Sequence, residues 1–212
     1  VKNNNAATRK RRVISLRNFF RFLNLTVEVI DSDPTKKLVT PKLNRSLPKF
    51  MHEEECIALL NSIDGTNKER DYCIFVLFIN SGIRLSELVG LNYTDIDRQG
   101  DVVIRGKGSK ERRIIFNKAC LDALAEYEKF KEIHYQNKER DRDAVFVGRT
   151  GKRLTARRIE QIVKQRITAA GFGGRALSPH KLRHTAATVM YRRGVDIRAL
   201  QQILGHESLG TT

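Results

Sequence analysis

Apolar residues recur at helical spacing through most of the chain, which predicts a largely helical protein. The helical stretches cover 6–25, 52–62, 67–80, 83–88, 119–135, 155–170, 178–193 and a final segment between Asp196 and Gly205. Two short apolar runs, 102–104 and 113–116, flank the glycine-containing turn 106–109 and predict a hairpin. A third short strand is expected at 145–147. The pattern predicts a mainly α fold with a small antiparallel β-sheet, an α+β protein.

Several helix ends carry residues that suit them. Gly82 follows the second-domain helix 67–80 and suits a left-handed C-terminal cap. Ser178 followed by Pro179 is an N-cap and first-position pair. Side chains next to these boundaries lie at element edges, where functional groups gather.

The chain divides into three parts by composition. Residues 1–25 contain the helix 6–25, which cannot bury its many aromatic residues alone, so we expect the last helix of a helical domain that begins before Val1. Residues 26–50 hold three of the four prolines together with scattered basic residues, and they predict a linker. Residues 51–212 predict a second domain with its own core.

The charge balance favours a polyanionic partner. The chain carries 40 Lys and Arg against 24 Asp and Glu, a net charge of +16, and residues 1–27 hold no acidic residue. Such an excess indicates nucleic acid, and double-stranded DNA is the expected partner. The basic residues expected to contact DNA are Arg9, Lys10, Arg11, Arg12, Arg17, Lys110, Arg112, Arg157 and Arg158.

Cysteine usage and hydropathy favour an intracellular protein. Cys56, Cys73 and Cys120 form no C-x-x-C pair and lie in apolar helical surroundings, as expected of reduced core thiols. The polar, basic N-terminus shows no signal peptide pattern, and the longest apolar run, 73–79, is too short to span a bilayer. We expect a bacterial, cytoplasmic, nucleoid-associated protein without a membrane partner.

The helix that begins at Ser178 carries the most informative group of side chains. His180, Arg183 and His184 share one face, because positions i, i+3 and i+4 are neighbours on a helix. Positive donors near a helix N-terminus suit a phosphate that is changing bonds. Two histidines at this spacing also permit a metal site, but the intervening Lys181 and Arg183 oppose a dication, so no metal is expected.

Three other positions add to this group. Arg84 precedes Glu87 by three residues, Lys107 stands between two glycines in the hairpin turn, and His206 follows Gly205. Taken singly, Arg84 and Glu87 form an ordinary local ion pair and Lys107 is a solvated lysine. Together with His180 and Arg183 they indicate phosphoryl transfer by positive donors, without metal or cofactor.

Four segments resemble the tyrosine recombinase, or phage-type integrase, family in its Xer-type and transposon integrase branches. These segments are Ser81–Leu88, Gly106–Arg112, Ser178–Thr188 and Leu204–His206, in the order and at the spacing of the family. The resemblance implies a catalytic domain over 51–212, preceded at 1–25 by the last helix of a core-binding domain. It also implies site-specific recombination or integration of DNA by a homo-oligomer, with a tetrameric synapse.

The resemblance also implies residue roles. In this family, strands are cut and rejoined through a 3′-phosphotyrosyl intermediate. Arg84 and Arg183 would bind the non-bridging oxygens of the scissile phosphate, and Lys107 would protonate the leaving 5′-oxygen. His180 and His206 would donate hydrogen bonds to the transition state. Glu87 would support the site and His184 would be structural.

The nucleophilic tyrosine of the family is expected just after Thr212, so no residue of the chain is assigned this role. We expect a fragment that lacks most of the core-binding domain and the tyrosine segment and cannot cleave DNA alone. A non-catalytic, recombinase-like DNA-binding accessory protein is the alternative. A metal-dependent nuclease is disfavoured because carboxylates are not clustered. The target sequence, and the choice between chromosome-dimer resolution and phage or transposon integration, stay open.

Overall fold

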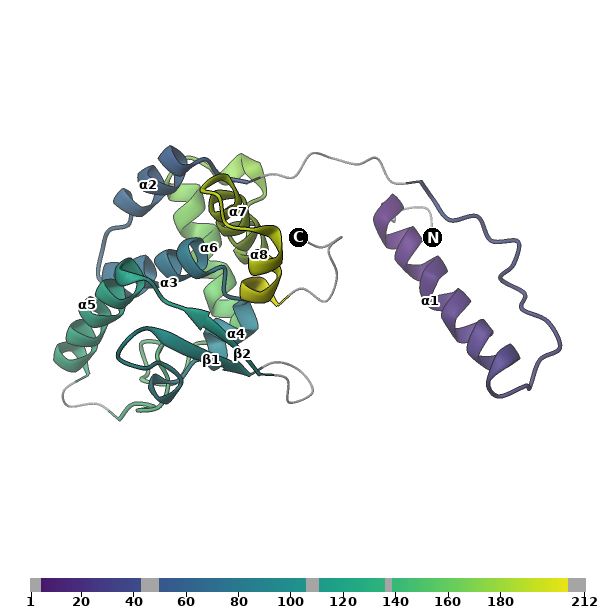
Figure 1. Ribbon diagram of the computed structural model, residues 1–212, viewed down its shortest axis with the longest axis horizontal. Coiled ribbons are helices and arrows are strands. Elements are labelled where there is room, and N and C mark those ends of the chain that lie inside the picture. Colours follow the sequence, from purple (N-terminus) through teal and green to yellow (C-terminus); the bar gives the residue numbers. More distant parts are fainter. Residues whose placement is uncertain (1–4, 43–49, 106–110, 136–138, 206–212) are drawn as a thin grey trace. The chain divides into compact units, whose positions relative to one another are not determined.

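The computed structural model describes residues 5–42, 50–105, 111–135 and 139–205. The chain divides into two units, Val1–Pro48 and Lys49–Thr212. Helices dominate, and the described residues include one antiparallel sheet of two strands (Figure 1). The predicted α+β class is therefore confirmed.

The first unit contains helix α1, Ala6–Leu25. The Asn5 side chain caps it by accepting a hydrogen bond from the Thr8 N–H at 2.8 Å. No residue of α1 is buried, and its aromatic residues Phe19 and Phe22 are about half exposed. Residues 27–42 form neither helix nor strand, and that 26–50 is a linker stays a prediction. That α1 belongs to a larger helical domain stays a prediction.

The second unit contains seven α-helices and two short 3₁₀ helices within the described ranges. Each predicted helix is found within a few residues of its expected bounds. The helices are α2 Glu53–Asn61, α3 Lys68–Ser81, α4 Leu85–Gly90, η1 Tyr93–Asp95, α5 Lys118–His134, α6 Ala156–Ala169, η2 Gly173–Arg175, α7 Pro179–Arg192 and α8 Ile197–Leu204.

Helix α3 is central to the core of the second unit. It is apolar on nearly all sides, and Cys73 to Phe78 are buried without a break. A helix with this pattern needs neighbours around it, and α3 packs against both α5 and α7 (Figure 1). Its C-terminal end is thereby fixed between these helices, at the place where the candidate site begins.

The sheet is the predicted hairpin, made of β1, Asp101–Arg105, and β2, Glu111–Ile115. Val102 pairs with Ile114, and Ile104 pairs with Arg112. The apolar members of these pairs are buried, so this face of the sheet points to the core.

The prediction of a third strand at 145–147 is wrong. Val145 and Phe146 are buried, but their backbones bond separately to Leu91 and Leu154, and Val147 makes only an isolated bridge with Arg153. The apolar run therefore reflected burial in the core, which strands and buried loops share, rather than pairing in a ladder.

The predicted core thiols are confirmed, since Cys56, Cys73 and Cys120 are free and buried. Within the described ranges, no helix is long and apolar enough to cross a membrane.

Gly82 allows a close contact between α3 and α8. It ends α3 in the left-handed conformation, at φ +62°, and a Cβ at this position would lie 2.8 Å from Leu204 Cδ2 of α8. The absence of a side chain at Gly82 therefore lets α8 lie against the end of α3.

We predict that Gly82→Ala destabilises the protein by about 2–4 kcal/mol, because it adds overpacking to left-handed strain. Gly194→Ala is the matched control. Gly194 is also left-handed, at φ +89°, but has open space around it. Gly194→Ala should therefore lower the free energy of unfolding by only about 1 kcal/mol. Urea unfolding of both variants measures the difference, and equal losses would contradict the packing argument.

Candidate functional site

Arg84 lies where α3 gives way to α4. The left-handed Gly82 turns the chain, Ile83 is fully buried, and Arg84 is the N-cap of α4. The Glu87 carboxylate accepts hydrogen bonds from the Arg84 N–H and from Arg84 Nη1, both at 2.8 Å. This confirms the expected local pairing of Arg84 with Glu87, which holds a side chain that is still 38% exposed.

Arg183 reaches the same place from α7. Ser178 caps this helix with Pro179 at its first position, as predicted. Arg183 is only 6% exposed, and its guanidinium donates to the carbonyls of Gly82 and Leu204. Burial, followed by the nearby charge of Arg84, lowers the pKa of Arg183 to about 10. The group therefore stays charged at neutral pH.

Arg112 reaches it from strand β2. Its Nη2 donates to Glu87 Oε2 at 2.9 Å, its Nη1 donates to Glu87 Oε1, and its Nε donates to the Ile203 carbonyl at 3.3 Å. From the sequence, Arg112 was expected to contact DNA, whereas in the structure its guanidinium binds other parts of the protein. Strand periodicity was the available signal, because Arg112 shares a face with the buried Ile114.

The three arginines meet at the C-terminal end of α8. They bind three successive carbonyls, those of Ile203, Leu204 and Gly205, with Arg84 Nη2 donating to Gly205 at 2.6 Å. The last carbonyls of a helix lack intrahelical partners and carry partial negative charge, which favours cations there. Arg84, Arg112, Arg183 and Glu87 are called the arginine cluster below.

Gly205 lets the arginine side chains come close to the end of α8. Its backbone is left-handed, at φ +60°. A Cβ at Gly205 would lie 2.8 Å from Arg112 Cδ and 3.4 Å from Arg84 Nη1. The glycine that ends α8 therefore leaves room for two of the three arginines.

The arginine cluster contains three guanidinium groups and one carboxylate, an excess of positive charge. Burial alone would raise the pKa of Glu87, but hydrogen bonds from Arg112 and Arg84 outweigh it and hold that pKa at about 2. Guanidinium groups match phosphate oxygens in geometry and charge, so the cluster can bind a phosphate group. Within the described ranges, no group of three potential metal ligands is found.

The two histidines of α7 differ in exposure. His180 is exposed and His184 is half-buried, with ring centroids 5.0 Å apart and planes at 84°. Burial, then the neighbouring His180, lowers the pKa of His184, which keeps it neutral at pH 7. His180 lies one turn before Arg183, in the first turn of the helix, and its exposed ring can donate a hydrogen bond to a ligand.

The other predicted residues fall in three groups. Lys107, Lys110 and His206 lie outside the described residues. The predicted DNA contacts Arg157 and Arg158 are exposed in the first turn of α6. The remaining ones are on α1 in the first unit, where Arg17 donates to Thr40 and Leu38 while the others are exposed or half-exposed; these are Arg9, Lys10, Arg11 and Arg12.

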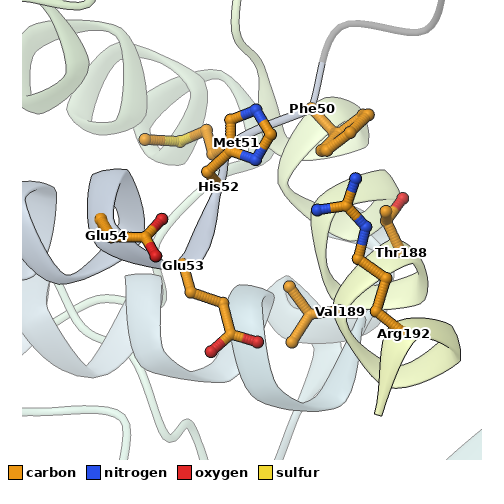
Figure 2. A pocket seen from close by; sticks show the side chains of 8 residues that line it. All are labelled: Phe50, Met51, His52, Glu53, Glu54, Thr188, Val189 and Arg192. Carbon is orange, nitrogen blue, oxygen red and sulfur yellow. The ribbon is translucent and has the colours of Figure 1, made fainter. Parts of the chain in front are cut away.

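The beginning of the second unit is attached to α7. The Met51 N–H donates to Thr185 Oγ1 at 3.0 Å, two residues beyond Arg183. The Arg192 guanidinium lies 5.0 Å from the centre of the Phe50 ring, and Figure 2 shows it extended towards that ring. Arg175 donates to the Phe50 carbonyl at 2.7 Å. These contacts join residues far apart in sequence, and no local pattern indicated them.

A pocket of about 180 Å³ lies beside this attachment. Its lining includes Glu53, Thr188 and Arg192, and Figure 2 shows them around it. None of the residues of the arginine cluster lines the pocket. It therefore belongs to the attachment of the chain to α7 rather than to the candidate site.

Comparisons with known proteins agree on one family. The profile described as "Phage integrase family" matches residues 49–212. The tyrosine recombinase XerC of Caldanaerobacter subterraneus subsp. tengcongensis is 43% identical over 212 residues, which are the whole of this chain and 59% of that protein. XerC of Chlamydia trachomatis serovar L2 is 36% identical over 208 residues, 97% of this chain and 65% of that protein. The chain thus spans less than two thirds of these relatives.

A solved structure agrees with the fold. The crystal structure of the XerH site-specific recombinase bound to palindromic difH substrate, a post-cleavage complex, has a TM-score of 0.81 and 25% sequence identity. The match covers 97% of this chain and 62% of that one.

The charge of Glu87 should make stability depend on pH. Its pKa is lowered on folding from 4.5 to about 2, so its contribution is present above pH 4.5 and is lost as the pH falls towards 2. Glu87→Gln should therefore lower the free energy of unfolding by about 3 kcal/mol at pH 6, with a difference that shrinks below pH 4.5.

Urea unfolding between pH 2.5 and 7 measures this difference. Glu126→Gln is the control, because Glu126 pairs with Lys129 on the exposed surface of α5 and should have little effect. A loss of unfolding free energy in Glu87→Gln that does not change with pH would contradict the lowered pKa of Glu87.

Proposed function

Because the chain belongs to the phage integrase family of tyrosine recombinases, we propose that the protein carrying it is a site-specific recombinase. It cuts and rejoins DNA strands through a 3′-phosphotyrosyl intermediate. The observation that carries this proposal is the arginine cluster, in which Arg84, the N-cap of α4, and Arg183 of α7 bind adjacent carbonyls at the end of α8. Two guanidinium groups held together in this way suit the non-bridging oxygens of one phosphate.

In the proposed reaction, Arg84 and Arg183 stabilise the charge that develops on the phosphate. A guanidinium has five N–H donors. In the described bonds, each of these side chains uses two of its N–H donors on the protein. Further N–H donors therefore remain for the phosphate oxygens. Glu87 keeps Arg84 in place, and His180 adds a donor from the first turn of α7. His184, half-buried and neutral, is assigned a structural role.

The remaining steps are assigned to residues outside the described ranges. Lys107 protonates the leaving 5′-oxygen as general acid, and His206 donates a hydrogen bond to the transition state. The nucleophile is a tyrosine carried by the protein after Thr212, which attacks the phosphorus and forms the 3′-phosphotyrosyl bond. The free energy of the broken phosphodiester is conserved in that bond, so rejoining needs no nucleotide or other cofactor.

Double-stranded DNA is the proposed partner. The related XerH structure is described as bound to its difH substrate, and the described basic residues of this chain include exposed arginines at the start of α6. We propose that four copies assemble on two DNA sites. The domain roles follow the same proposal, with 1–25 as the last helix of a core-binding domain, 26–50 as linker and 51–212 as catalytic domain.

Arg183→Lys in the protein carrying this chain should strongly slow covalent attachment to DNA. A nicked duplex with the protein's own site traps the adduct, which a denaturing gel resolves and protease digestion removes. The wild type should form the adduct. Arg183→Lys should lower the rate at least about 100-fold, because lysine cannot make the paired contacts of a guanidinium.

Arg193→Lys is the matched control. Arg193 lies next to the end of the same helix, pairs with Glu53 and is largely exposed, so both rate and affinity should stay unchanged. DNA binding without any adduct from the wild type would support the accessory-protein alternative and contradict the proposed chemistry.

Arg157→Ala should weaken binding to non-specific duplex DNA and reduce the salt dependence of log Kd by about one unit of slope. The reason is that one phosphate contact is lost, with its released counterion. Lys129→Ala, which removes an exposed lysine of α5, is the control and should leave the slope unchanged. Fluorescence anisotropy between 50 and 300 mM salt measures both slopes, and an unchanged slope for Arg157→Ala would remove this residue from the DNA interface.

A further inference from the structure

Arg112 is bound on three sides by other parts of the protein. Its side chain is 16% exposed. Two of its nitrogens bind the two oxygens of Glu87, and the third binds the Ile203 carbonyl of α8. Its methylene chain passes Gly205 so closely that a Cβ there would be only 2.8 Å away. This side chain therefore contacts the end of one helix and the buried carboxylate of another.

Glu87 is shared between two arginines. Its Oε1 accepts from Arg84 Nη1 and also from Arg112 Nη1, while Oε2 accepts from Arg112 Nη2 and the Arg84 N–H. The carboxylate is only 5% exposed, so water does not replace a missing partner easily. Arg112 of β2 therefore fixes the orientation of Glu87 and, through it, that of Arg84.

We infer that Arg112 is a positioning residue for strand cleavage, which holds Glu87 and the end of α8 so that Arg84 meets the phosphate in one orientation. This inference rests on the proposed function. Arg112 itself does not touch the reacting atoms. It acts through Arg84, whose long side chain is 38% exposed and has many rotamers to lose.

A lysine cannot take over this role. An ammonium group is a single point donor, whereas Arg112 makes a paired contact with a carboxylate and a third contact with a carbonyl in a different direction. Arg112→Lys keeps the positive charge and the apolar stem, so it changes the geometry around Glu87 more than the charge of the site. Arg113→Lys is the matched control, because Arg113 is the next residue of β2 and is exposed on the opposite face.

The test uses the protein carrying this chain and the nicked duplex with its own site. At saturating protein, a single-turnover time course gives a rate constant and an amplitude for the adduct, and anisotropy gives the Kd. We expect Arg112→Lys to lower the rate constant about tenfold or more, since small misplacements of catalytic groups are costly. Amplitude and Kd should stay within about twofold of the wild type, and Arg113→Lys should leave the rate constant unchanged.

Each other outcome has a definite meaning. A raised Kd with an unchanged rate constant at saturation would make Arg112 a DNA contact, and a reduced amplitude with an unchanged rate constant would make it purely structural. Either result overturns the inference while leaving the proposed function in place. A wild-type protein that binds its site but forms no adduct overturns the proposed function and the inference with it.

Discussion

The attraction between three guanidinium groups and the C-terminal carbonyls of α8 organises the second unit of this protein. Arg84, Arg112 and Arg183 come from a helix cap, a strand and a second helix, and each binds one of three consecutive carbonyls. Like charges this close repel one another. The repulsion is offset by the partial negative charge of the helix end and by the ionised Glu87.

The packing of the unit serves the same arrangement. The apolar helix α3 sets the position of Gly82, and the bare backbone of this glycine admits Leu204 of α8. Gly205 in turn leaves room for the side chains of Arg84 and Arg112. Two glycines, at the ends of two helices, thus bring backbone carbonyls and arginine side chains within bonding distance. The resulting group of three guanidinium side chains and one carboxylate carries an excess of positive charge, which suits a phosphate group.

Local features of this arrangement could be predicted from the sequence, and distant ones could not. Helix caps such as Ser178 and Gly82, and the pairing of Arg84 with Glu87, depend on residues within a few positions of one another. The bond between Arg112 and Glu87 spans 25 positions, and that between Arg183 and Gly82 spans 101. Such pairs depend on how elements pack. Arg112 was therefore interpreted as a DNA contact, although its alternation with Ile114 already indicated a half-buried face.

The shortness of α8 has a consequence for the cooperativity of the candidate site. Helices of only eight residues are marginal alone in water, so α8 depends on its neighbours for its existence. Those neighbours include the very arginines that it holds in place. The helix and the arginine cluster therefore stabilise each other and act as a single cooperative unit. The arrangement of the three guanidinium groups thus depends on the folding of one short helix, rather than being set by the arginine side chains alone.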